Sequence, residues 1–372
     1  MGPCRSGGRG RSGPRVTLPL LATPLGLRKA GLGDARERAR IDDFVRAQPE
    51  ATPFHLTAWQ RAVAIGCGQR AHCLVAERAN GAIAGVLPLT EIRSMLFGRA
   101  LVSSGFGVGG GILAEIDEAV APLADAGWAL AQKLGCPTME IRGGAPPGTD
   151  WQVDDATYLN FSRPLAVDDD AELAAIPRKH RAEIRKGLAA DLDVVFARDD
   201  RAQAQHFAVY AESVRNLGTP VFPRKLFREA LIHFGTDSDI AVVLQQGVPV
   251  ASVLTLYFGG CAYPYWGGGT FAARGLRANE RMYFALMGHA RARGCTRFDF
   301  GRSKVGTGPA AYKHHWGFEG VPLRYFKRCA KGQVARDVNP LNPRYQAKIA
   351  RWKKLPLWIA NRAGPLIAAG LG

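Results

Sequence analysis

The chain has 372 residues, a length that suits two domains of ordinary size better than one. Hydrophobic residues make up 47% of the chain and charged residues 22%, which are proportions of a folded soluble protein and exclude a disordered chain, a coiled coil and a collagen. No segment reaches the roughly 20 consecutive apolar residues that a membrane-spanning helix needs. The nearest, residues 359–371, is interrupted by Asn361, Arg362 and Pro365.

The net charge of +17 is concentrated at the two ends of the chain. Residues 1–33 hold six Lys and Arg and no acid, and residues 320–372 hold eleven against one acid, Asp337. These ends carry +6 and +10, which leaves only +1 for the rest. Because a nucleic-acid-binding domain usually spreads its basic residues over a folded face, an RNA-binding function is disfavoured. The ends are predicted to meet a polyanion or an anionic membrane.

The seven cysteines are scattered and contain no C-x-x-C pair, which argues against both a structural zinc site and a disulfide framework. The pattern indicates a reduced, cytoplasmic protein. Residues 1–34 are predicted to be a disordered basic tail, because their Gly/Arg-rich start cannot bury a core. A secretory signal is the alternative, and it is disfavoured because Pro19 and Pro24 interrupt the apolar run.

The pattern becomes regular after this tail. The first half predicts helices over 42–47 and 57–65, a strand over 73–77, a hairpin at Asn80-Gly81 and a returning strand over 82–90. A strand over 101–104, a glycine cluster over 105–111, a helix over 117–134 and strands over 136–142 and 158–162 follow.

The second half repeats this order of elements. It predicts a helical segment over 170–188 that Pro177 breaks, then further helices and three strands joined by turns at Gln246-Gly247 and Gly259-Gly260. The remaining predicted elements are helices over 200–215, 224–234 and 278–293, and strands over 240–245, 248–258, 261–266 and 296–301. Because the order repeats with almost no residue identity, the chain is predicted to contain two units of one α/β architecture that meet near residues 150–170.

One segment carries a resemblance to a known family. TRFDFGRSKVGTGPAAYKHHWGF (296–318) resembles the strand and loop signature of FemAB/FemX-type peptidyltransferases and related GNAT acyltransferases. The helix segment 275–295 and the basic segment 177–186 are also similar to that family. Segments 44–60, 86–106, 215–227 and 339–358 resemble the FemAB-like subgroup associated with PEP-CTERM/exosortase and exopolysaccharide loci.

The resemblance covers about residues 40–372 and implies an α/β (α+β) fold of two tandem GNAT-like domains. The expected division is a tail over 1–34, an N-terminal GNAT-like domain over 35–165, a C-terminal GNAT-like acyltransferase domain over 166–335 and a basic aromatic tail over 336–372. It implies an acyl- or aminoacyltransferase with no bound cofactor, acting in exopolysaccharide or cell-envelope assembly. The acceptor is then a small molecule or a lipid-linked saccharide.

Two donors remain open. Acyl-CoA-binding GNATs usually show Gln/Arg-x-x-Gly-x-Gly/Ala before the long helix, where loop amides hold the pyrophosphate. Here Ala272 stands in the first position and Arg277 in the last. Acyl-CoA and aminoacyl-tRNA are both expected donors, and tRNA is a partner only in the second case.

Three residues are predicted to be catalytic. Asp299 alternates with Phe298 and Phe300 on a strand, so it faces away from them and can orient or deprotonate an acceptor; alternatively it pairs with Arg302 or caps the turn. Lys313 can stabilise an oxyanion or a phosphate, and Tyr312 can return a proton. The alternative is a solvated lysine and a packing tyrosine.

Seven more residues are predicted to bind substrate or donor. Tyr263 and Tyr265 lead into a run of glycines where a GNAT sheet would splay, and Arg274 and Asn279 lie at the start of the following helix. Arg181, Arg185 and Lys186 share a helix face after Pro177 and can hold a phosphate, although such a run is more often a solvated face. His314-His315 is not expected to bind metal, because neighbours on an extended chain point to opposite sides.

The rival hypothesis is a non-catalytic GNAT-like scaffold that binds a membrane-associated polysaccharide or export component. Convergence of Asp299, Lys313 and Tyr263 on one cleft would favour the enzyme. Within the C-terminal tail, Tyr345, Ile349 and Trp352 fall on one helical face until Pro356 interrupts it. This face predicts either a strap packed on the second domain or a weak contact with an anionic membrane. In the second case the protein would be peripheral at the inner face of the membrane.

Overall fold

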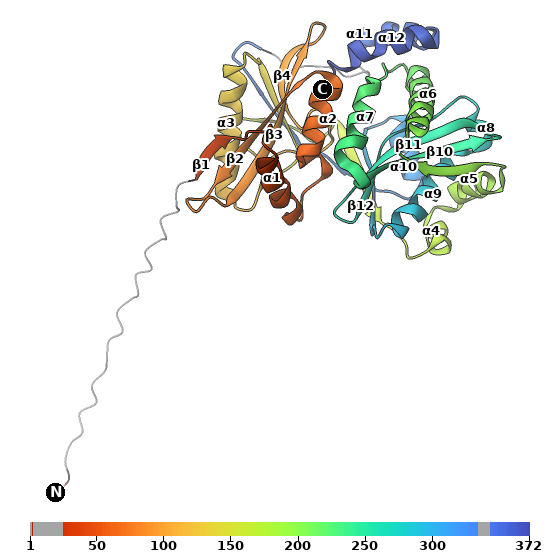
Figure 1. Cartoon of the computed structure of the whole chain (residues 1–372), viewed down its shortest axis with the longest axis horizontal. Coiled ribbons are helices and arrows are strands. Elements are labelled where there is room, and N and C mark those ends of the chain that lie inside the picture. Colours follow the sequence, from red (N-terminus) through yellow and green to blue (C-terminus); the bar gives the residue numbers. More distant parts are fainter. Residues whose placement is uncertain (1, 3–24, 334–342) are drawn as a thin grey trace.

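The computed structural model describes Gly2 and residues 25–333 and 343–372, and two sheets dominate it (Figure 1). The first unit runs, in chain order, through β1 (Gly26–Lys29), α1 (Ala35–Ala47), α2 (Thr57–Cys67), β2 (Arg70–Glu77), β3 (Ile83–Ser94), β4 (Gly98–Ser103), β5 (Leu113–Ala114), α3 (Val120–Lys133) and β6 (Thr138–Arg142). The linking segment holds β7 (Gln152–Asp154) and β8 (Tyr158–Pro164).

The second unit repeats the first. Its elements are α4 (Asp169–Ala175), α5 (Arg178–Ala189), β9 (Asp193–Ala197), α6 (Asp200–Leu217), α7 (Arg224–Phe234), β10 (Ser238–Gln245), β11 (Val248–Phe258), β12 (Cys261–Gly269), α8 (Ala273–Leu276), α9 (Ala278–Ala292), β13 (Arg297–Lys304), α10 (Gly308–His315), β14 (Gly320–Pro322) and β15 (Tyr325–Cys329). In both units an edge strand, two helices, three antiparallel strands, one long helix and a parallel strand follow one another. The predicted repeat of two tandem units is therefore confirmed.

Turn chemistry explains why the hairpins form where the sequence predicts them. The Asn80 side chain accepts a hydrogen bond from the amide of Ala82, and Gly81 has φ +82°. Gln246 and Gly247 both have positive φ, as the tight turn between β10 and β11 requires. The break at Pro177 is also confirmed, because α4 ends at Ala175 and α5 begins at Arg178.

The units exchange strands across the predicted boundaries at residues 165 and 335. The first sheet has the order β1-β2-β3-β4-β6-β15-β7, and the second has the order β14-β8-β13-β12-β11-β10-β9. β8 therefore leaves the first unit to pair with β13, while β15 returns from the second unit to pair with β6. Sequence order alone does not reveal this exchange, because it is made by hydrogen bonds between distant segments.

The units also share a core. One hydrophobic cluster joins side chains of α1, α2 and the first sheet to side chains of α6, α7 and the second sheet. α2 and α7 touch closely, since a Cβ on Gly66 would lie 2.5 Å from the Cα of Leu226. The opposite faces of the sheets have separate cores, under α3 in the first unit and under α5, α9 and α10 in the second.

The predicted N-terminal tail is wrong in part. Residues 26–29 form β1, paired antiparallel with β2, and the Arg28 guanidinium binds the Glu77 carboxylate on the neighbouring strand at 2.8 Å. α1 begins at Ala35, earlier than expected, because Asp34 caps it by accepting from the amide of Arg36. Residues 1 and 3–24 of the predicted tail lie outside the described residues.

The C-terminal segment forms two helices, α11 (Pro343–Lys353) and α12 (Leu357–Ala368), separated as expected at Pro356. They cross α6 of the second unit, where Ile349 and Lys353 enclose Gly218. The chain then reaches the first unit, where Gly370 lies against Ser94 and Gly372 against Ile92. The predicted strap is therefore present, and it touches both units.

Candidate active site

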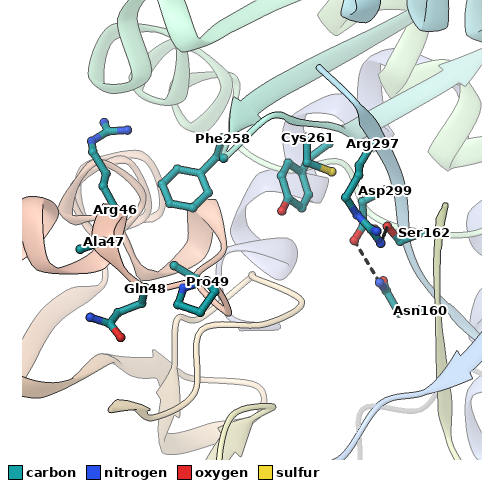
Figure 2. A pocket seen from close by; sticks show the side chains of 13 residues that line it. Arg46, Ala47, Gln48, Pro49, Asn160, Ser162, Phe258, Cys261, Arg297 and Asp299 are labelled. Atoms are coloured by element: carbon teal, nitrogen blue, oxygen red, sulfur yellow. Dashed lines mark hydrogen bonds between the residues drawn. The ribbon is translucent and has the colours of Figure 1, made fainter. Parts of the chain in front are cut away.

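A pocket of about 480 Å³ lies between the units (Figure 2). The end of α1 and the loop after it form one wall, and strands of the second sheet form the other. The lining residues are Arg46, Ala47, Gln48, Pro49, Ala51, Asn160, Ser162, Phe258, Gly259, Cys261, Tyr263, Arg297 and Asp299. Neither unit builds this site alone, because α1 belongs to the first and β13 to the second.

Asp299 supplies a half-buried carboxylate to the pocket. Asn160 on β8 donates its side-chain amide to Oδ2 at 3.0 Å, and the backbone N–H of Gly301 donates to Oδ1 at 2.6 Å. Burial raises the pKa of Asp299 above its ordinary value, and these hydrogen bonds and the Lys313 charge only partly offset the effect. The side chain thus caps its own turn and also faces the pocket; Arg302 is not its partner and instead donates to the Tyr325 hydroxyl at 2.9 Å.

Lys313 approaches the same turn from α10. Its ammonium donates to the carbonyl oxygens of Gly301 at 2.8 Å and Arg302 at 3.0 Å. Burial lowers the pKa of Lys313 to about 7, although the Asp299 carboxylate opposes this shift. The expected aromatic turn is a helix, and the lysine is not solvated. Gly301 connects the two groups, since its N–H binds Asp299 and its carbonyl binds Lys313.

Tyr312 points elsewhere. It packs among the side chains of the separate second-unit core, with its ring 6.3 Å from that of Tyr283 and 5.7 Å from that of His180. Burial first, and then the Glu280 carboxyl, raises the pKa of Tyr312 well above its ordinary value. The three predicted catalytic residues therefore divide between the two faces of the second sheet. Asp299 faces the first unit, and Tyr312 faces α9.

The two predicted tyrosines of β12 also have different surroundings. Tyr263 lines the pocket with Asp299, and burial raises the pKa of its hydroxyl. Tyr265 lies in the aromatic cluster between the units, 5.2 Å from the ring of Trp59, and its hydroxyl donates to the carbonyl of Phe106. Tyr265 thus joins the units and is absent from the pocket lining.

The segment predicted to hold the donor lies at the start of α9. β12 and β13 pair for only two residues each, Cys261 with Arg297 and Ala262 with Phe298, and then separate. Beyond that point the buried Oδ1 atom of Asn279 has no hydrogen-bond partner, and Arg274 is exposed on α8. The Arg277 guanidinium is occupied by Glu183, so of these two arginines only Arg274 is available to a donor phosphate.

The predicted basic face of α5 does not act as one site. Arg181 turns back and donates to the carbonyls of Ala174 and Ile176, which closes the break before the helix. Lys186 pairs with Glu183 at 2.8 Å, and Arg185 is exposed. The interpretation as a solvated and structural face fits these contacts better than a phosphate site.

His314 and His315 lie on a helix, so the argument from an extended chain was wrong. Their surroundings are aromatic: the His314 ring is 5.0 Å from that of Phe161, and the His315 ring is 6.0 Å from that of His180. Within residues 25–333 and 343–372, no group of three or more His, Cys, Asp or Glu side chains is placed to hold a metal ion. No helix in the same residues is long and apolar enough to cross a bilayer.

Sequence reasoning missed several pocket residues. Asn160 and Ser162 come from β8, about 140 positions before Asp299, and Arg46 and Gln48 come from the first unit. Arg297 was the most accessible to prediction, since it lies two residues before Asp299 and shares its face of the strand. The others carried no local pattern, because only the exchanged strand and the packing of α1 bring them to the site.

Comparisons with known proteins agree with this architecture. A family model described as the acetyltransferase (GNAT) domain matches residues 177–314. The structure of FemX is similar at a TM-score of 0.63 and 16% identity, over 83% of this chain and 98% of that one. No curated protein sequence matches the chain.

Two further solved structures share the fold. One is a tandem GNAT protein from the clavulanic acid biosynthesis pathway, with a TM-score of 0.54, 13% identity, and coverage of 84% of this chain and 100% of that one. The other is the C-terminal domain of a putative lysylphosphatidylglycerol synthetase from Agrobacterium fabrum, with a TM-score of 0.54, 14% identity, and coverage of 80% and 93%.

The fold and the pocket thus define a protein of two GNAT-like domains in tandem. Within that class, residues 177–314 of the second unit match the acetyltransferase (GNAT) domain.

Proposed function

We propose that the protein transfers an acyl or aminoacyl group to an amine or hydroxyl acceptor held between the two units. One observation carries the proposal: the half-buried carboxylate of Asp299 faces the pocket, while Lys313 on α10 binds the carbonyl of the same Gly301 turn. A carboxylate whose pKa burial has raised is suited to accept a proton from an acceptor at neutral pH. A non-catalytic scaffold would not need a half-buried acid and a half-buried lysine at one turn.

The reaction can be assigned to the pocket and to the Gly301 turn beside it. The acceptor nitrogen or oxygen attacks the donor carbonyl carbon and gives its proton to Asp299, while the Lys313 ammonium stabilises the developing negative charge through its field at the Gly301 turn. The C–S bond of an acyl-CoA, or the ester C–O bond of an aminoacyl-tRNA, then breaks. Asp299, protonated in the attack, returns the proton to the leaving group, because Tyr312 lies on the other face of the sheet and is absent from the pocket lining.

The charges of the pocket suggest the chemistry of the acceptor. Arg46 and Arg297 are exposed at its walls, whereas Asp299 is half-buried within it. An amine or hydroxyl directed at Asp299, beside a phosphate or carboxylate directed at the arginines, complements this arrangement. A lipid-linked saccharide of exopolysaccharide or cell-envelope assembly has such groups. We propose this class, as the resemblance to the PEP-CTERM-associated subgroup also suggests.

Donor and acceptor can be separated by experiment. The purified protein is incubated with acyl-CoA or aminoacyl-tRNA and an amino-sugar phosphate, and mass spectrometry records the acylated acceptor. Asp299→Asn should lower turnover by about 10²- to 10⁴-fold with an unchanged melting temperature. Glu140→Gln, which changes a carboxylate of the first unit, should keep turnover within about threefold. Equal activity of Asp299→Asn and the wild type would remove Asp299 from the chemistry.

A further inference from the structure

α12 exposes its large apolar side chains and buries its small ones. Ala360, Gly364 and Ala368 are spaced four residues apart and face the protein, with the backbone of Val221 close to Gly364. Trp358, Arg362 and Leu366 have the same spacing on the opposite face. Trp358 is 71% exposed and Leu366 is 82% exposed. A helix that served only as a packed strap would place these two side chains inward.

The β3–β4 hairpin also exposes large apolar side chains. Met95 and Leu96 form its tip and are 104% and 68% exposed. The tip is nevertheless held in shape, because the Ser94 hydroxyl accepts from the amides of Leu96 at 3.3 Å and Phe97 at 3.1 Å. An ordered turn therefore presents two apolar side chains to solvent.

The end of α12 and the hairpin are fastened together. The Gln69 side chain donates to the carbonyl of Ala369 at 2.7 Å and accepts from the amide of Arg93 at 2.8 Å. Gly370 also lies directly against Ser94 at the base of the tip. Figure 1 shows the hairpin and α11–α12 along one edge of the molecule. Segments about 270 residues apart in the sequence thus form one surface.

The charged side chains of the strap have a single sign. Residues 343–372 contain six Lys and Arg and no Asp or Glu. Arg351, Lys354 and Arg362 are exposed beside the apolar side chains of the strap, and Arg93 is exposed beside those of the hairpin. Apolar side chains set among cations complement a bilayer with anionic headgroups, in which the former enter the acyl boundary and the latter meet phosphates.

We propose that this surface, formed by Met95, Leu96, Trp358 and Leu366 with the surrounding Arg93, Arg351, Lys354 and Arg362, binds an anionic lipid bilayer. The apolar side chains provide insertion, and the cations provide selectivity for anionic lipid. Because the surface spans both units, binding also holds the hairpin of the first unit and the strap of the second in one plane. The inference does not depend on the proposed acyl transfer.

The test is co-sedimentation of the full chain with vesicles of phosphatidylcholine, with and without 30 mol % phosphatidylglycerol (about a third anionic lipid). The wild type should bind the anionic vesicles at least about tenfold more strongly than the neutral ones. Met95→Ser/Leu96→Ser and Trp358→Ser/Leu366→Ser should each weaken binding about tenfold, since each removes two inserting side chains. Arg351→Gln/Lys354→Gln/Arg362→Gln should abolish the preference for anionic lipid.

Val167→Ser/Val321→Ser is the matched control, because both valines are exposed apolar residues outside this surface. It should bind vesicles as the wild type does, and circular dichroism of every variant checks that the fold survives. Absence of wild-type binding, or equal loss in the control, would overturn the proposal. So would a concentration-dependent dimer that the two apolar variants dissociate, which would assign the surface to a second copy of the chain.

Discussion

The two units have a carboxylate at the same point of the fold, and its pKa is shifted in opposite directions. Met139 on β6 and Phe298 on β13 both pack under the long helix of their unit, and the next residue on each strand is Glu140 or Asp299. Burial opposes ionisation of Glu140, but Arg142, Lys327 and Arg302 outweigh it and leave its pKa below the ordinary value. The pKa of Asp299 lies above its ordinary value.

The difference comes from the residue two positions further on. Arg142 binds Glu140 at 2.7 Å, whereas the corresponding residue of the second unit is Gly301, which offers only a backbone N–H. Both units therefore have an acidic residue at this position, and only the one in the first unit is paired with an arginine side chain. The second unit leaves its carboxylate facing the pocket.

The loops after the third antiparallel strand differ in the same sense. In the first unit, Trp59 donates to the carbonyl of Gly105 at 3.1 Å, and Tyr325 donates to that of Val108 at 2.8 Å. In the second unit, Thr270 and Asn279 keep buried polar atoms without partners. Such atoms are costly unless something satisfies them, and we propose that a ligand does so at the second loop.

We expect the largest effect on stability when the ion pair between Arg142 and Glu140 of the first unit is broken. Arg142→Met should lower the free energy of unfolding by about 3 kcal/mol, because it removes a buried guanidinium and leaves the half-buried Glu140 carboxylate without its main partner. Arg297→Met, an exposed arginine on the corresponding strand of the second unit, should change it by less than about 0.5 kcal/mol. Urea denaturation measures both. A loss of similar size in the two variants would contradict the division between a structural and a functional strand.

Lys313 gives the next effect. Lys313→Met should lower turnover by about 10²-fold, because it removes the charge at the Gly301 turn without opening a large cavity. The control variant is Lys327→Met. Lys327 belongs to the first sheet, where it binds Asp154 at 2.8 Å, so turnover of this variant should stay within about threefold of the wild type. Steady-state kinetics on folded protein decide the matter. Unchanged turnover in Lys313→Met would make the lysine purely structural.

The pH dependence of the free energy of unfolding tests the titration of Lys313. The pKa of Lys313 is about 7 in the folded chain against an ordinary value of 10.5. Between these values the unfolded chain binds more protons, so the free energy of unfolding gained from this group rises with pH, by up to about 1 kcal/mol per pH unit. Wild type should therefore gain stability relative to Lys313→Met from pH 7 to pH 10. A constant difference between their denaturation curves would show that the lysine titrates normally.

The smallest effect concerns the turn itself. Gly301 has φ +67° with open space where a Cβ would lie, so Gly301→Ala should cost about 1 kcal/mol through backbone strain alone. Gly275→Ala, in the short helix α8, also has open space and no positive φ, and it should be neutral or slightly stabilising. Thermal melting of both variants tests this. Equal melting temperatures would mean that the turn relaxes.

The local sequence pattern predicted much of the fold. The hairpins at Asn80-Gly81 and Gln246-Gly247, the break at Pro177 and the order of elements in both units depend on turn geometry and periodicity, which act within a few residues. The start of α1 was missed because its charged first turns hide the apolar spacing. Strand β1 was missed because a short edge strand gains its stability from β2 and has little pattern of its own.

The sequence by itself determined the two-unit α/β architecture, the placement of Asp299 opposite Phe298 and Phe300, and the charge of the ends, since these follow from composition and alternation. Only the tertiary structure decided that β8 and β15 change sheets, that Asn160 meets Asp299, that Tyr312 lies on the other face, and that the strap meets the β3–β4 hairpin. These features depend on hydrogen bonds and packing between segments far apart in the chain. Their free energy comes from burial and pairing that no local window of residues contains.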